Sequence, residues 1–144
     1  MTRIENSTII NKPVDEVLCY ASDREKWSDW FEGVSDFKPT TEIRKGNQAR
    51  YAYKAKMMGL NVNVETEIQN FVINQGWTGK GTKGVPTQTQ WLFKKLEHST
   101  KFTYVLEYKL PFPLLSSLFD KYIMKPQWNR IIEKSLQNLN QKFQ

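Results

Sequence analysis

The chain has 144 residues, of which 39% are hydrophobic and 13% aromatic, so it is long enough for one domain with a sizeable apolar core. Its single cysteine, Cys19, excludes an internal disulfide, and one cysteine with one histidine cannot make a zinc site of the usual kind. The net charge of +6 comes from lysines spread along the second half rather than clustered, which argues against a nucleic-acid-binding protein.

The N-terminal segment lacks the apolar stretch of a signal peptide, and no apolar run is long enough to span a membrane. We therefore expect a soluble, cytoplasmic protein. Its basic side chains are expected to form a solvated face. Attraction to an anionic ligand or transient contact with a membrane surface is the alternative.

The start of the chain predicts a strand followed by two short helices. Residues 4–10 have the composition of a strand, and Pro13 is well placed as the first residue of a helix. Residues 22–25 have the spacing of a capping box with Ser22 as the cap. A second helix is therefore expected over residues 23–31.

An antiparallel meander is predicted next. Alternating side chains predict strands over residues 33–38, 50–58, 61–68, 85–96 and 101–110. The apolar face switches after Asn70, which indicates a bulge. The glycine-rich residues 76–84 do not match a phosphate-binding loop. We expect them to form a mobile surface connection that could act as a gate, with Trp77 closing over the opening.

A long helical pattern over residues 114–143 ends the sequence. Its apolar positions recur at helical spacing: Leu118, Tyr122, Ile132, Leu136, Leu139 and Phe143. This stripe must be buried, and the predicted sheet is the only partner that the sequence offers, so a hollow between the two is expected. Pro126 lies inside the pattern and predicts a bend or a restart of the helix. The apolar residues 110–119 are expected to form a packed corner between strand and helix. The functional alternative is a lid, or a tip that touches a membrane when the ligand is exchanged.

This order of elements, with Pro13-Val14-Asp15-Glu16-Val17 after the first strand and residues 23–30 after the first helix, resembles the START-like helix-grip superfamily. That superfamily includes lipid-transfer domains, plant pollen allergens and polyketide cyclases. Residues 46–50 and the helix at residues 128–139 also fit, so the resemblance covers nearly the whole chain.

The resemblance implies one α+β domain over residues 1–144 with the helix-grip fold. A curved antiparallel sheet of about six to seven strands would wrap around the long C-terminal helix, with two short helices after the first strand. It further implies a deep cavity between sheet and helix that holds a hydrophobic or amphipathic small molecule. Fold alone does not identify that ligand.

Strand parity and helical spacing predict which side chains face this cavity. The expected ligand-binding residues are Trp30, Tyr53, Met57, Val64, Trp77, Trp91, Phe93, Tyr104, Leu106, Tyr108, Leu118, Tyr122 and Ile132. Inward hydroxyls, among them those of Tyr104, Thr87 and Thr89, would orient a ligand by hydrogen bonds.

No catalytic residue is predicted. His98 lies in an expected hairpin turn, and Cys19 follows two acidic residues, which is not the electropositive setting that activates a thiol. Glu65, Glu67 and Glu107 fall on the outward face of their strands, which makes them poor general acids or bases.

The function expected from the sequence is binding, or transport, of a small hydrophobic or aromatic molecule, without cofactor, metal or nucleic acid. Two alternatives stay open. The resemblance implies a polyketide cyclase or dehydratase that uses the same cavity, and the basic helix suggests a protein-interaction module. The oligomeric state is left open.

Overall fold

The computed structural model describes residues 2–57, 60–83, 86–109 and 120–144. Seven antiparallel strands form a single sheet with the order β1-β7-β6-β5-β4-β3-β2. The strands are β1 (Thr2–Ile10), β2 (Val34–Pro39), β3 (Arg50–Met57), β4 (Leu60–Val72), β5 (Gly76–Lys83), β6 (Thr87–Lys95) and β7 (Thr100–Tyr108). The helix-grip fold expected from the sequence is confirmed.

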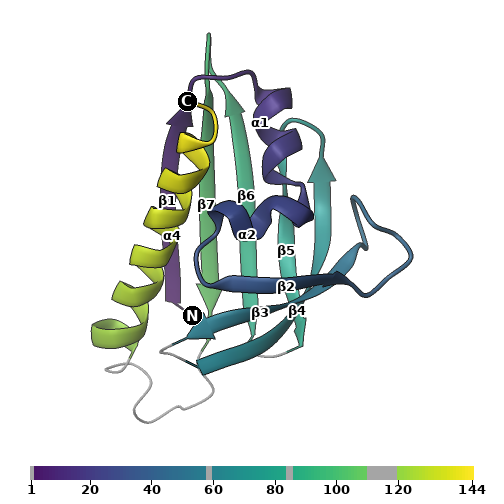
Figure 1. Cartoon of the computed structure of the whole chain (residues 1–144), viewed down its shortest axis with the longest axis vertical. Helices are drawn as coiled ribbons and strands as arrows, with labels where there is room; N and C mark the ends of the chain where they lie inside the picture. The colour runs from purple at the N-terminus through teal and green to yellow at the C-terminus, as the bar shows by residue number, and fades with distance from the viewer. Residues whose placement is uncertain (1, 58–59, 84–85, 110–119) are drawn as a thin grey trace.

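The sheet is strongly curved (Figure 1). Strands β1, β7, β6 and β5 run along the long axis of the molecule, whereas β2 and β3 cross it below the short helices. Strand β4 connects the two directions, and its pairing with β5 shifts register between Gln69 and Val72. Asn70 adopts a left-handed backbone conformation there, with φ of 54°. The bulge predicted after Asn70 is confirmed, and it helps the sheet to curl around its concave face.

The helices of the described residues lie on the concave face (Figure 1). They are α1 (Val14–Ala21), a 3₁₀ turn η1 (Arg24–Lys26), α2 (Trp27–Trp30), a π-helical turn η2 (Asp120–Met124) and α4 (Lys125–Gln141). The predicted capping box is wrong in detail. Asp23, not Ser22, caps η1 by accepting a bond from the Glu25 amide, because Ser22 belongs to the end of α1 and its hydroxyl donates to Cys19.

The C-terminal helix restarts next to Pro126, as expected, because π-helical geometry ends at Met124 and α4 begins at Lys125. Proline in the first turn of α4 removes no hydrogen bond that the helix needs. The buried stripe of α4 includes Ile132, Leu136 and Leu139, as expected. Leu118 and the rest of residues 110–119, including the predicted lid or corner, lie outside the described residues.

Tyr122 does not belong to that stripe. Its side chain is 67% exposed, whereas Met124 is buried and Trp128 is half-buried. Ten residues separate Tyr122 from Ile132, which places the two about 80° apart on an ideal α-helix, and the π-helical turn shifts the phase again. Met124, Trp128 and Ile132 follow one another at the four-residue spacing that keeps side chains on one face.

Of the glycine-rich segment predicted as a surface connection, residues 76–83 form strand β5 instead. β5 pairs with β4 on one side and with β6 on the other, so it lies inside the sheet. The gate expected there is therefore wrong, and Trp77 is a core residue with 3% of its surface exposed. The sequence was misleading because glycine is generally depleted in strands. Here Gly79 and Gly81 are accommodated because a side chain at either position would come too close to threonines of β6.

Polar side chains fasten the second half of α4 to its surroundings. The Ser135 hydroxyl is fully buried, accepts a hydrogen bond from the Glu32 amide at 2.9 Å and donates to the Ile131 carbonyl at 2.7 Å. Asn138 donates to the Trp30 carbonyl, and Asn140 donates to the Ile9 carbonyl in β1. These bonds hold α4 against both the short helices and the edge strand β1.

Replacing Ser135 with Ala should lower the free energy of unfolding by about 1–2 kcal/mol, because the part-buried hydrogen bond from the Glu32 amide and the bond to the Ile131 carbonyl are both lost. Urea denaturation measures this. Asn129→Ala is the matched control, since its bond to Asn6 is exposed, and it should change stability by less than about 0.5 kcal/mol. Equal losses in both variants would show that Ser135 has no special role.

Candidate functional site

Aromatic side chains fill one end of the space between the sheet and the helices. The indoles of Trp27, Trp91 and Trp77 form a stack, with ring centroids 4.9 Å apart at each step and interplanar angles of 18° and 19°. Phe93 and Phe102 stack beside them at 4.7 Å. These rings come from α2, β5, β6 and β7, so this end of the concave face is a packed core.

Side chains become short at the next inward positions of the same strands. Trp91 is followed on the concave face of β6 by Thr89 and then Thr87, and Trp77 in β5 is followed by Gly79 and then Gly81. A Cβ atom at Gly79 would lie 2.4 Å from the Thr89 hydroxyl, and one at Gly81 would lie 2.6 Å from the Thr87 hydroxyl. Glycine is therefore needed for these threonines to lie close to the sheet.

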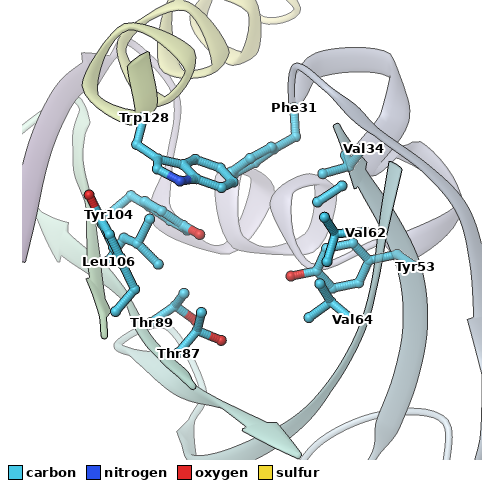
Figure 2. Close-up of a pocket in the computed structure, with 12 residues that line it drawn as sticks. Phe31, Val34, Tyr53, Val62, Val64, Thr87, Thr89, Tyr104, Leu106 and Trp128 are labelled. Atoms are coloured by element: carbon cyan, nitrogen blue, oxygen red, sulfur yellow. The ribbon is translucent and has the colours of Figure 1, made fainter. Parts of the chain in front are cut away.

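A cavity occupies the end of the concave face where these side chains are short, between the sheet, α2 and α4 (Figure 2). Its volume is about 60 Å³. The lining residues are Phe31, Val34, Tyr53, Ala55, Val62, Val64, Thr87, Thr89, Tyr104, Leu106, Tyr108 and Trp128. Phe31 from the end of α2 and Trp128 from α4 cover it on the helical side, and both side chains are half-buried.

The polar groups on the cavity wall are hydroxyls and one indole. Figure 2 shows the Tyr53 and Tyr104 hydroxyls pointing toward each other from opposite walls. Neither hydroxyl has a hydrogen-bond partner among the described residues. Within the same described part of the chain, the Thr89 hydroxyl makes one hydrogen bond, a long one of 3.4 Å to the Gly79 carbonyl. The cavity therefore offers unused hydrogen-bonding groups in apolar surroundings.

The phenols of Tyr53 and Tyr104 are held in their neutral form. Burial raises the pKa of Tyr53 to about 12. Burial, and then the proximity of Tyr53, raises the pKa of Tyr104 well above its usual range. The neighbouring Tyr51, which lies against Trp27, also has a pKa well above the usual range, first because of burial. At neutral pH these phenols keep their protons, so they are available as hydrogen-bond donors and not as bases.

The candidate catalytic groups weighed from the sequence lie away from this cavity. Glu65 points to the outer face and accepts a 2.7 Å bond from Thr82, which lowers the pKa of this carboxyl. The His98 side chain is 90% exposed, and Cys19 is an exposed free thiol. Within the described ranges, no three His, Cys, Asp or Glu side chains gather in a group that could hold a metal ion.

The structure brings part of the predicted binding set to the cavity. Five of the predicted residues line it: Tyr53, Val64, Tyr104, Leu106 and Tyr108. Five others are buried in the adjoining core without lining it: Trp30, Trp77, Trp91, Phe93 and Ile132. Tyr122 is exposed on η2, and the Met57 side chain and Leu118 lie outside what the structure describes.

Several lining residues were absent from the predicted binding set. They are Phe31, Val34, Ala55, Val62, Thr87, Thr89 and Trp128. A signal existed for some of them. Val62 has the same strand parity as Val64, the two threonines were expected to face inward, and Trp128 precedes Ile132 by one helical turn. No sequence pattern separates cavity-lining positions from core positions on one face, because that depends on the neighbours across the sheet.

Comparisons with known proteins agree with this architecture. A sequence profile of the family described as "Polyketide cyclase / dehydrase and lipid transport" matches residues 1–144. A comparison with curated proteins found no match. Among the described residues, no helix is long and apolar enough to cross a membrane.

Solved structures share the fold at low sequence identity. TTHA0849 from Thermus thermophilus superposes with a TM-score of 0.85 at 19% identity, covering 99% of this chain and 97% of that one. The Zhui aromatase/cyclase from Streptomyces sp. R1128 has a TM-score of 0.79 at 10% identity, with 98% and 92% covered. A START superfamily protein from Mycobacterium smegmatis has a TM-score of 0.71 at 13% identity, with 98% and 96% covered.

The buried phenols should make the fold sensitive to alkaline pH. Their pKa values are raised on folding, so their contribution to stability is complete below the ordinary phenol pKa of about 10. It is lost as the pH rises toward the folded-state pKa of Tyr53, about 12. We expect the free energy of unfolding from urea denaturation to fall steadily between about pH 10 and about pH 12.

The comparison of two phenylalanine variants isolates this effect. Tyr53→Phe should give a shallower decline than the wild type over the same pH range, because one buried phenol no longer titrates. Tyr122→Phe should follow the wild type, since the Tyr122 ring is 67% exposed. Identical pH profiles for all three proteins would contradict the link between the buried phenols and alkaline stability.

Proposed function

We propose that this chain, which belongs to the polyketide cyclase/dehydrase and lipid transport family, acts as a single domain that binds a small hydrophobic or aromatic molecule in the cavity between its sheet and α4. The observation that carries the proposal is the cavity itself. It is apolar, it lies under Phe31 and Trp128, and the Tyr53 and Tyr104 hydroxyls on its wall have no hydrogen-bond partner among the described residues. Its wall thus combines apolar surface with a few hydrogen-bonding groups, as ligand sites do.

A cavity in this position is costly to a fold that has no use for it. Protein interiors are normally close-packed, and unfilled apolar volume of this size costs roughly 1 kcal/mol. Larger side chains at Thr87 or Thr89 would fill the space, and the strand would accept them readily because branched and large residues favour strands. The short inward side chains of Thr87 and Thr89, which lie against Gly81 and Gly79, support selection for an open volume.

The size of the cavity bears on how a ligand would bind. At about 60 Å³ it is smaller than the engineered cavities of about 150 Å³ that hold benzene. A ring-sized ligand must therefore displace side chains at the rim. Phe31 and Trp128 are suited to this, since both are only half-buried and lie at the ends of separate elements. Binding would then proceed with rotation of these two rings.

A cyclase or dehydratase that uses the same cavity is the second candidate. The family description and the aromatase/cyclase among the similar folds favour it. Neutral phenols could polarise a carbonyl, but no described residue that lines the cavity is a base. Turnover of a polyketide precursor, followed by mass spectrometry, would establish the enzyme. The same method applied to natively purified protein would identify a co-purified ligand.

A protein-interaction module remains a third candidate, and a stable protein complex that survives with the cavity filled would favour it. For the binding proposal, the expected location is the cytoplasm, which suits the free thiol of Cys19.

Filling the cavity should weaken binding without harming the fold. Thr89→Leu replaces a hydroxyl with a weak hydrogen bond by a larger apolar side chain that extends into the cavity. The affinity for α-methylstyrene, a single-ring apolar probe, should fall about tenfold or more, while the melting temperature holds or rises. Isothermal titration calorimetry and thermal unfolding measure the two effects.

Thr78→Leu is the matched control, because Thr78 lies in β5 on the opposite face of the sheet from Gly79. It should leave probe affinity unchanged, as should His98→Ala and Cys19→Ser at the exposed positions. Undiminished binding in Thr89→Leu would mean that the probe does not occupy this cavity.

A further inference from the structure

Two hydroxyls on the cavity wall, those of Tyr53 and Tyr104, are hydrogen-bond donors without an acceptor. Each of the Tyr53 and Tyr104 hydroxyls carries a proton that finds no described acceptor, and Figure 2 shows these hydroxyls directed at the same space. A donor without a partner in apolar surroundings is unfavourable, whereas an unused lone pair on a hydroxyl that already donates costs less. The two protons therefore call for acceptor atoms in whatever fills the cavity.

The wall also contains no charged side chain among the described lining residues. Lysines and arginines are plentiful in the chain, but those of the strands around the cavity, such as Lys54 and Lys80, are exposed on the outer face. A carboxylate in the cavity would lose its hydration without gaining a counter-ion, and an ammonium group would do the same.

We propose that the cavity selects an uncharged ligand that bears a carbonyl-type acceptor oxygen, held between the Tyr53 and Tyr104 hydroxyls. The inference rests on the proposed binding function and specifies the chemistry of its ligand. A carbonyl oxygen has two lone pairs and can accept from both phenols at once, which a ligand hydroxyl or amine does less well. Ketones, quinones and neutral esters fit this description, and fatty acids and amines do not.

The behaviour of the phenols supports the exclusion of anions. Burial raises the pKa of Tyr53, which means that negative charge is disfavoured at the position of its oxygen. A ligand carboxylate held beside that oxygen would meet the same surroundings. A carboxylic acid should therefore bind only in its protonated form, so that its apparent affinity falls as the pH rises above the pKa of the free acid.

Three probes of similar size test the inference on the whole protein. Acetophenone has the carbonyl, α-methylstyrene replaces its oxygen with a methylene group, and benzoate carries a charge. Dissociation constants are measured by calorimetry at neutral pH for four proteins. They are the wild type, Tyr53→Phe, Tyr104→Phe and the double variant Tyr53→Phe/Tyr104→Phe. For each protein we take the ratio of its affinities for acetophenone and α-methylstyrene. The free probes are hydrated equally in every titration, so this contribution cancels when the ratios of two proteins are compared.

That ratio should fall about tenfold from the wild type to the double variant, with an intermediate value in each single variant. The matched control Tyr122→Phe should keep the wild-type ratio because Tyr122 is exposed on η2. Benzoate should bind at least about tenfold more weakly than acetophenone to the wild type. The infrared carbonyl stretch of bound acetophenone should shift to lower frequency in the wild type and return in the double variant.

Each other outcome is decisive in a different way. If both neutral probes bind but the ratio is the same in the wild type and the double variant, the carbonyl clamp is wrong and the binding function stands. If benzoate binds as tightly as acetophenone, selection for uncharged ligands is wrong. If neither neutral probe binds the folded wild type, the proposed function fails, and this inference fails with it.

Discussion

The stack of Trp27, Trp91 and Trp77 is the contact on which the rest of this structure depends. It joins the short helix α2 to two central strands, with 4.9 Å between successive ring centroids. The indole N–H of Trp27 also donates a 2.5 Å bond to the Ala21 carbonyl at the end of α1. Three large flat rings thereby fix how far the helical layer stands from the sheet.

The cavity follows from that fixed separation. Where the inward residues are tryptophan and phenylalanine, they span the space between the layers and no room is left. Where the same strands continue with Thr89, Thr87, Gly79 and Gly81, the layers stay apart but the side chains no longer meet. The volume is thus produced by a change in side-chain size along one face rather than by a special loop.

This origin explains which features the sequence could predict. Alternation placed most strands within a few residues of their observed bounds and assigned Tyr53, Tyr104 and Leu106 to the concave face, because period-two patterning is a property of each strand alone. The division of that face into core and cavity depends on ring stacking between strands and α2, which are distant in sequence. Trp91 and Phe93 were therefore expected at the ligand, although they fill the core beside it. The strand β5 was missed for a related reason: its glycines leave room for threonine side chains of the neighbouring strand β6, and the sequence does not show that the two strands pair.

The attachment of α4 is uneven along its length, and this bears on how the cavity can admit a molecule. Ser135, Asn138 and Asn140 fasten the second half of the helix to α2 and β1 by partly buried hydrogen bonds. The first half has the exposed pair Asn6–Asn129 and follows a π-helical turn. Trp128 lies in this first half, so the ring that covers the cavity belongs to the part of α4 with the fewest restraints among the described residues. If the cavity binds a ligand as proposed, this difference in attachment among the described residues would let the ligand exchange without disturbing the aromatic core.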